Sequence, residues 1–119
     1  MKAILLVSHG SRSPKTKEEI LALVNVLRQR LPGKIVEFAF LEIERPGIPD
    51  GIDICAAQGA TEIVVTLNFL NAGRHVDEDI PSIVRSAIKK YPQIKFILSC
   101  PVGQHPQIPN LFIDLINNA

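Results

Sequence analysis

The sequence predicts a single α/β domain in which helices cover both faces of a four-stranded parallel sheet. Short apolar runs rich in branched side chains alternate with longer segments whose apolar residues recur at helical spacing. Four runs and four helical segments follow one another in strict alternation, which is the pattern of a parallel sheet. No linker, repeat or low-complexity segment interrupts residues 1–119, and this length suits one hydrophobic core.

The first strand and the first helix have the clearest boundaries. Residues 2–8 are apolar on both faces, as expected of a strand buried within a sheet. Ser13 and Pro14 supply a helix N-cap and a proline at the first helical position, where its missing N–H is not needed. Pro32-Gly33 ends this helix. Its apolar face consists of Ile20, Leu23, Val24, Leu27 and Leu31.

Two further strands and a short helix follow. The second strand is predicted over residues 34–41, with Glu42 directly after it. A loop rich in proline and glycine leads into a short helix over 50–58, which stops at Gly59. The third strand is predicted over 62–68.

The last third of the chain repeats this alternation. A loop over residues 69–76 precedes a helix that ends before Pro92. Three acids open this helix, and Asp79 among them is expected to stabilise the positive helix end rather than to bind a ligand. The fourth strand is predicted over 94–99 and the last helix over 107–117.

The last helix is apolar on more than one side. Its large apolar residues are Leu111, Phe112, Ile113, Leu115 and Ile116. A four-stranded sheet is small for this class of fold and cannot cover so much apolar surface by itself. We therefore predict a homodimer that buries the surplus.

Composition and charge narrow the classes of partner. Thirteen basic and twelve acidic side chains give a net charge of +1, so no nucleic-acid partner is expected. A local basic rim of Arg12, Arg45 and Arg74 is compatible with that total. No run approaches the roughly 18 apolar residues that span a bilayer, and the N-terminus lacks a secretory signature. We expect a cytoplasmic protein without a membrane partner.

The two cysteines, Cys55 and Cys100, have neither C-x-x-C nor zinc-finger spacing. Both are predicted to be small buried apolar residues. Cys100 and His105 are expected to be neighbours at the end of the fourth strand, in a packing or rim role.

Each of the three histidines follows a predicted strand. His9 follows the first, His75 the third and His105 the fourth. The carboxyl ends of parallel strands share one edge of the sheet, where ligands bind in such folds, so we expect all three there. Imidazole is the commonest metal ligand and the usual acid–base group near neutral pH. Together with Glu42, His9 and His75 predict a metal or general-base site.

Simpler interpretations of the same residues remain open. His9 would only cap a turn in an anion-binding loop, and Glu42 would be a helix cap or a surface carboxylate. A phosphohistidine-type phosphatase also ends its first strand with a histidine. Such enzymes present an Arg-His-Gly triplet whose arginine holds the phosphate with two hydrogen bonds, and here Ser8 takes the arginine's place.

Four motifs occur in order along nearly the whole chain. They are His9-Gly10-Ser11-Arg12, Ala39-Phe40-Leu41-Glu42, Gly73-Arg74-His75-Val76 with Asp79-Ile80-Pro81, and Gly103-x-His105-Pro106. Together they resemble the small sirohydrochlorin chelatases, the short single-domain forms of the cobalt-inserting class II chelatase family. The resemblance implies a chelatase-like (flavodoxin-like) fold and a homodimer that mimics the two halves of longer chelatases.

The resemblance also implies residue roles. His9 matches the family's proton acceptor, which also contacts the metal. His75 matches a second metal-contacting histidine, and Glu42 an acidic residue of the same site. The positions that match the tetrapyrrole lining are Arg45, Leu70, Asn71, Ala72, Gly73, Arg74 and His75. One departure is Thr66-Leu67-Asn68, where the family often has a proline shortly before the Phe-Leu of this loop.

The chemistry of these residues agrees with that resemblance. Metal insertion removes two pyrrole protons and delivers a partly desolvated cation, and a neutral imidazole both accepts a proton and binds Co²⁺, Ni²⁺ or Fe²⁺. The expected function is a lyase-type sirohydrochlorin cobaltochelatase for cobalamin biosynthesis. Its divalent metal is a substrate, and no permanently bound cofactor is expected. The alternatives are nickel or iron insertion, for coenzyme F430 or sirohaem, and a non-catalytic tetrapyrrole or metal carrier.

Overall fold

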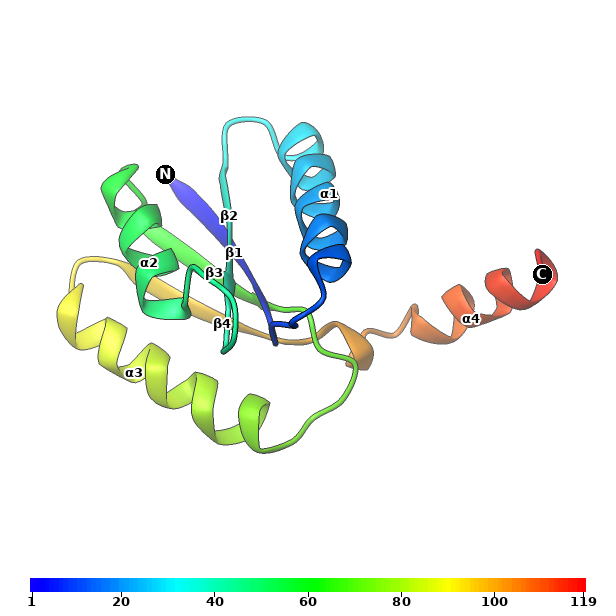
Figure 1. The fold of residues 1–119 in the computed structure, drawn as a ribbon. Coiled ribbons are helices and arrows are strands. Elements are labelled where there is room, and N and C mark those ends of the chain that lie inside the picture. The colour runs from blue at the N-terminus through cyan, green and yellow to red at the C-terminus, as the bar shows by residue number, and fades with distance from the viewer.

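A computed structural model describes residues 1–119 and has the predicted four-stranded parallel sheet with helices on both faces (Figure 1). The strands are β1 (Lys2–Ser8), β2 (Ile35–Phe40), β3 (Glu62–Leu67) and β4 (Lys95–Pro101), in the order β2-β1-β3-β4. This is the flavodoxin-like strand order. The chain passes from β1 to β2 on one side of the sheet and then from β3 to β4 on the other, so the order reverses between β1 and β3. Ligands in such sheets bind at this reversal, outside the carboxyl ends of the strands.

The handedness of the crossovers decides which face each helix covers. Helix α1 (Pro14–Arg30) connects β1 to β2, whereas α2 (Ile48–Ala57) and α3 (Ile80–Lys90) belong to connections that run the opposite way across the sheet. Right-handed crossovers therefore place α1 on one face and α2 with α3 on the other. Helix α4 (Ile108–Asn117) crosses neither face, because it leaves the end of β4 and projects away from the sheet (Figure 1).

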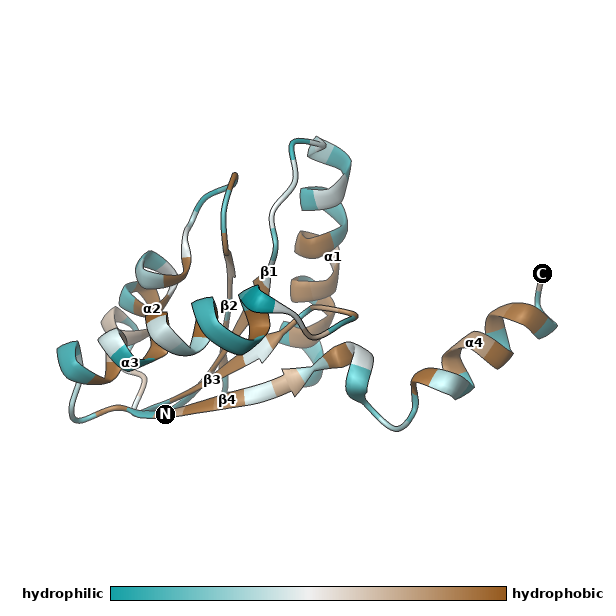
Figure 2. Ribbon diagram, turned by 90° about the horizontal axis from the view of Figure 1, so that it is seen from below, coloured by the Kyte–Doolittle hydropathy of each residue, from teal (hydrophilic) through white to brown (hydrophobic).

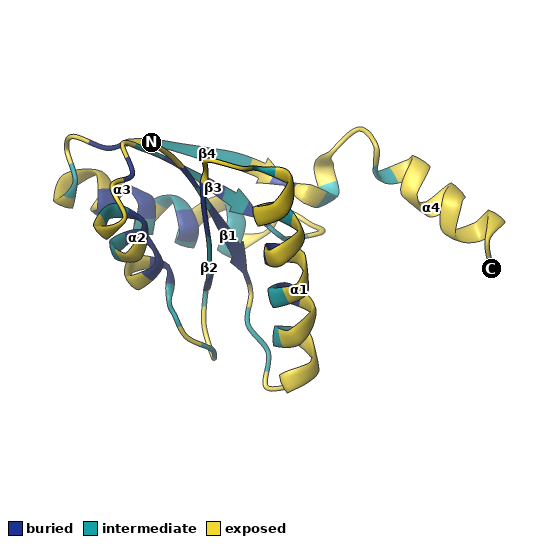
Figure 3. Cartoon of the chain, turned by 90° about the horizontal axis from the view of Figure 1, so that it is seen from above, coloured by how far each residue is buried: buried dark blue, intermediate teal, exposed yellow.

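Two apolar clusters hold these layers together. The larger one lies between the sheet and α2–α3, and its fully buried side chains include Leu5, Ile52 and Ile80. The smaller one lies beneath α1 and consists of Leu6, Ile20, Val24, Val36 and Phe40. Burying a side chain of this size contributes about 1.5–3 kcal/mol. Strand β1 supplies both clusters because it lies inside the sheet and is covered on both faces (Figure 3).

Three predicted boundaries differ from the structure by two residues. Helix α2 begins at Ile48 rather than at residue 50, because Pro49 fits in the first turn of a helix. A one-turn π-helix, η1 (His75–Asp79), begins inside the predicted loop. Strand β4 continues to Pro101, where a shift in its register against β3 pairs Leu67 with Pro101.

The cysteines differ from each other in exposure. Cys55 is buried as predicted, and burial raises the pKa of its thiol to about 12. The prediction for Cys100 is wrong, since this residue is exposed. Strand β4 is the sheet edge, and no helix covers its carboxyl end, so the site of Cys100 stays open.

None of the helices combines the length and the apolar character that a membrane crossing requires.

Candidate metal and proton-transfer site

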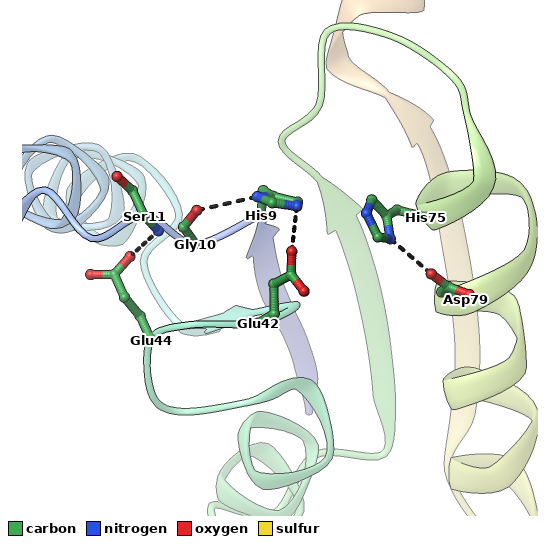
Figure 4. A network of polar contacts seen from close by, with 7 residues as sticks. All are labelled: His9, Gly10, Ser11, Glu42, Glu44, His75 and Asp79. Carbon is green, nitrogen blue, oxygen red and sulfur yellow. Dashed lines mark hydrogen bonds and ion pairs between the residues drawn. The ribbon is translucent and has the colours of Figure 1, made fainter.

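Two histidines and a glutamate from three separate segments of the chain meet at the carboxyl edge of the sheet. The imidazole centroids of His9 and His75 lie 5.2 Å apart, and Nε2 of His9 lies 2.9 Å from Oε1 of Glu42. One ligand atom from each of the three residues lies within 4.8 Å of the other two (Figure 4). The site occupies the point where the strand order reverses, between the ends of β1 and β3.

Backbone hydrogen bonds fix Glu42 beside His9. Beyond the last paired residues of β1 and β2, the N–H of Leu41 donates to the carbonyl of Ser8 (2.9 Å) and that of Glu42 to the carbonyl of His9 (3.1 Å). Gly10 has a φ of +104°, and a Cβ added there would collide with the Glu42 carbonyl. Only glycine permits this approach of the two loops, so Gly10 is a structural requirement of the site.

A second carboxylate ties the same two loops together. Glu44 accepts a hydrogen bond from the backbone N–H of Ser11 at 3.0 Å. Between the two glutamates, Ile43 has a φ of +71°, a backbone conformation that β-branched residues avoid. Such a residue stores on the order of 1–3 kcal/mol of strain and persists only where its surroundings enforce it. The loop bonds to Ser11 and His9 provide that constraint.

Asp79 orients the imidazole of His75. Its Oδ2 lies 2.8 Å from Nδ1 of His75 (Figure 4). A carboxylate only accepts here, so we assign the ring proton to Nδ1, which leaves the Nε2 lone pair free. Asp79 is the N-cap residue of α3, but its side chain makes no cap hydrogen bond and bonds His75 instead. The spacing of His75 and Asp79, four residues on a helical turn, was the available signal.

His9 has an acceptor beside each of its ring nitrogens. Its Nδ1 lies 3.2 Å from the carbonyl oxygen of Gly10, and its Nε2 lies 2.9 Å from Oε1 of Glu42. A neutral imidazole carries one proton and satisfies only one of these acceptors. A second proton, or a cation on the Glu42 side, satisfies both. The pair is therefore suited to take up a proton or to bind a positive ion.

The donor set also fits a small divalent cation. Two nitrogens and one carboxylate oxygen suit first-row transition metals. Bonds of about 2.1 Å allow ligands on opposite sides of an ion to be about 4.2 Å apart, close to the spread of these atoms. The side chains of His9, Glu42 and His75 are 45%, 50% and 45% exposed, so further coordination positions face solvent. The site can bind an ion without enclosing it.

The remaining predicted residues surround this cluster or lie outside it. His105 follows β4 but is not among the three converging ligands, and its Nδ1 accepts the backbone N–H of Gln107 at 3.0 Å. It lines a hollow together with Cys100. Arg45 is exposed, and Arg74 is exposed and pairs with Glu78 at 3.5 Å. The other exposed residues near the site are Arg12, Leu70, Asn71, Ala72 and Gly73.

Ser8 has a structural role that the sequence did not indicate. It is the one buried polar residue of the chain, and its hydroxyl accepts a hydrogen bond from Asn68 Nδ2 at 3.1 Å. This bond joins the ends of β1 and β3 beneath the two histidines. In the phosphatase interpretation, the position of Ser8 would hold a phosphate-binding arginine. A buried hydroxyl that already bonds Asn68 does not provide that anion site.

Comparisons with known proteins agree on one family. The sequence model of the CbiX family matches residues 3–119. The chain is 35% identical over 115 residues to the chloroplastic sirohydrochlorin ferrochelatase of Arabidopsis thaliana, which covers 97% of this chain and 49% of that protein. It is 36% identical over 108 residues to the sirohydrochlorin cobaltochelatase of Priestia megaterium, and this alignment covers 90% of this chain and 35% of that protein. The chain spans about half the length, or less, of these relatives.

A solved structure extends the likeness to three dimensions. The sirohydrochlorin chelatase SirB from Bacillus subtilis subspecies spizizenii, in complex with cobalt, superposes with a TM-score of 0.88 at 31% identity. The match covers 98% of this chain and 50% of that one. The four-stranded layer described above is therefore similar to half of that protein.

Proposed function

Because the chain belongs to the CbiX family, we propose that it inserts a divalent metal into sirohydrochlorin, as a lyase-type chelatase whose metal is a substrate. The observation that carries this proposal is the convergence of His9, Glu42 and His75 at the strand-order reversal. Insertion needs a proton acceptor and a metal-holding group on the same side of the macrocycle. The three side chains supply the proton acceptor and the metal-holding group, and their ligand atoms are close enough to contact one ion.

The proposed reaction exchanges two protons for one metal. Each of two pyrrole N–H groups loses its proton as its nitrogen forms a bond to the cation. His9 Nε2 accepts the two protons one after the other, and the Glu42 carboxylate 2.9 Å away shares each proton before it passes to solvent. His75 donates its Nε2 lone pair to the incoming ion and releases it as the pyrrole nitrogens take over. The half-exposed site lets the ion arrive and leave.

The exposed loop around the site suits the macrocycle. Sirohydrochlorin combines an apolar conjugated ring with many peripheral carboxylates. We propose that Arg45, Arg74 and Arg12 pair with those carboxylates, since guanidinium groups bind them with two hydrogen bonds. Leu70 is 67% exposed and would lie against the ring. The proposed contacts from this loop are those of Leu70, Asn71, Ala72, Gly73, Arg74 and His75.

We propose Co²⁺ as the inserted metal, on the route to cobalamin. The named relatives include both a cobaltochelatase and a ferrochelatase, and a donor set of two nitrogens and one oxygen accepts Co²⁺, Ni²⁺ and Fe²⁺. We also propose that the protein works as a homodimer in the cytoplasm, where its two free cysteines remain reduced. No nucleic acid or membrane takes part in this scheme.

An absorbance assay tests the function. Sirohydrochlorin is mixed with excess Co²⁺, Ni²⁺ or Fe²⁺ in parallel, with protein at a small fraction of the tetrapyrrole concentration and a protein-free control for each metal. A chelatase converts many equivalents of tetrapyrrole, fastest with Co²⁺ under this proposal. Conversion that stops at one equivalent per protein indicates a carrier. A faster reaction with Fe²⁺ or Ni²⁺ would reassign the metal and leave the reaction class unchanged.

A further inference from the structure

The segment after β2 carries two carboxylates that point in different directions. This segment, residues 41–47, projects beyond the carboxyl edge of the sheet (Figure 2). The Glu42 carboxylate lies beside His9, whereas the Glu44 carboxylate lies against the backbone N–H of Ser11 (Figure 4). Glu42 belongs to the three converging ligands and Glu44 does not. Glu44 is nevertheless the less exposed of the two, which indicates a role other than metal ligation.

The backbone between the two glutamates forms a strained γ-turn. The N–H of Glu44 donates to the carbonyl of Glu42 at 2.8 Å, and Ile43 between them has a φ of +71°. A three-residue turn with a positive φ at its centre is the rare form of the γ-turn, and a β-branched side chain makes it less favourable still. Ile43 is 56% exposed, so core packing of its side chain does not enforce this conformation. Bonds made by the neighbouring residues have to hold the turn.

Those bonds attach the turn at both of its ends. At the start, the N–H of Glu42 donates to the carbonyl of His9 at 3.1 Å. At the end, the Glu44 carboxylate accepts the N–H of Ser11 at 3.0 Å. Ser11 is itself held, because its hydroxyl accepts the N–H of Ser13, the N-cap residue of α1, at 3.0 Å. Glu44 therefore ties the end of the strained turn to the start of α1.

We propose that Glu44 is a positioning residue, which holds the γ-turn and so keeps the Glu42 carboxylate 2.9 Å from His9. Without this tether, Ile43 can relax to a negative φ. The peptide units on both sides of Ile43 then rotate, and Glu42 moves away from the other two ligands. The tether depends on an acceptor oxygen and not on charge. This role rests on the proposed function, because it matters to catalysis only if the site handles a metal.

Titration with Co²⁺, followed by the visible absorbance of the bound ion, gives the first test. Glu44→Ala removes the acceptor and should lower Co²⁺ affinity by about 10- to 100-fold, as for other residues that orient metal ligands. Glu44→Gln keeps an oxygen that can accept the Ser11 N–H and should keep most of the affinity. Glu18→Ala, which removes an exposed carboxylate from α1, is the control. Unchanged affinity in Glu44→Ala, or an equal loss in Glu44→Gln, would overturn the tether.

Two further backgrounds test whether Glu44 acts through the turn and through Glu42. In a Glu42→Ala chain, Glu44→Ala should cause no additional loss of Co²⁺ affinity, since no carboxylate remains to be positioned. In an Ile43→Gly chain, the positive φ is no longer unfavourable, so Glu44→Ala should cost less affinity. The full loss in either background would overturn the proposal, and circular dichroism checks that each variant is folded.

These measurements contain no tetrapyrrole, which separates this inference from the proposed function. A chain that shows the expected Co²⁺ affinities but converts no sirohydrochlorin would refute the chelatase and leave the role of Glu44 intact. A chain that converts sirohydrochlorin at the same rate and binds Co²⁺ equally well with and without the Glu44 carboxylate would refute only the role of Glu44.

Discussion

The Nδ1 atom of His75 lies 2.8 Å from Oδ2 of Asp79, one π-helical turn further along the chain. This contact turns the opposite ring nitrogen, Nε2, toward the space that His75 shares with His9 and Glu42 (Figure 4). Carboxylates that hold metal-binding histidines in this way fix both the tautomer and the direction of the lone pair. Asp79 thus acts on the site through His75 and has no contact with it of its own.

Replacement of Asp79 should weaken metal binding while the fold remains intact. In Asp79→Asn, the amide can present its NH₂ to Nδ1, which favours the tautomer with the proton on Nε2 and removes the lone pair from the site. We expect Co²⁺ affinity to fall by about 10- to 100-fold. Absorbance titration measures the affinity, and long-range ¹H–¹⁵N NMR reports the His75 tautomer. Asp77→Asn on the same turn is the control. An unaltered tautomer and affinity in Asp79→Asn would contradict the role.

Loss of His9 should abolish most of the chelatase turnover and leave the stability of the fold nearly unchanged. The ring is about half exposed and packs against no core residue, so His9→Ala should melt near the temperature of the unmodified chain. General-base contributions are on the order of 100- to 10,000-fold, and the insertion rate should fall accordingly. Initial rates at saturating metal and tetrapyrrole measure the effect. A folded His9→Ala protein with near-normal rates would remove His9 from the reaction.

Adjacent residues Arg74 and His75 should affect different substrates. His75→Ala removes a lone-pair donor and should weaken Co²⁺ binding and slow insertion at saturating tetrapyrrole. Arg74 is 82% exposed and permanently charged, so Arg74→Ala should mainly raise the KM for the polycarboxylate. Added salt should imitate the arginine change by screening exposed charges. Equal effects of both substitutions on metal binding, with tetrapyrrole affinity unchanged, would refute this division.

The two thiols should differ in reactivity. Because burial raises the pKa of Cys55 to about 12, almost none of it is thiolate at a pH of about 8, where thiol reagents act. Cys100 is exposed and accessible to the reagent. A disulfide-exchange reagent should therefore titrate one thiol rapidly in the native protein and two in denaturant, and Cys100→Ser should remove the fast one. Fast reaction of both thiols in the folded chain would contradict the packing around Cys55.

The contact between α2 and α3 should contribute less to the stability of the fold at acid pH than at neutral pH. Asp53 on α2 accepts hydrogen bonds from Tyr91 and Lys90, and chiefly the Tyr91 bond lowers the pKa of Asp53. A carboxyl with a lowered folded-state pKa stabilises the fold above its unfolded value of about 3.9, and that stability is lost as pH falls through the folded pKa. Urea unfolding of Tyr91→Phe should therefore differ from the unmodified chain more at neutral pH than near pH 2. An equal difference at both would mean that ionised Asp53 is not involved.

The sequence by itself determined the fold class and the edge of the sheet at which the candidate site residues lie. Its strict alternation of apolar runs and amphipathic segments predicts a parallel sheet, and the residues that directly follow parallel strands lie at one edge of that sheet. His9, Glu42 and His75 each follow a strand, so their presence on that edge required no knowledge of the strand order. The first strand, 2–8, and the start of α1 at Pro14 were equally readable, since buried runs and N-terminal prolines are local signals.

The tertiary structure decided which of the edge residues meet. Strand β1 lies between β2 and β3, so Glu42 and His75 both neighbour His9, whereas His105 follows β4, two strands or about 10 Å from β1. Exposure of Cys100 likewise follows from the place of β4 at the sheet edge. Likewise, the turn η2 (Val102–Gln104) before α4 is attached to the loop before His75 by a hydrogen bond from the N–H of Gly103 to the carbonyl of Phe69. Strand order and loop contacts join residues far apart in the chain, and no local pattern encodes them.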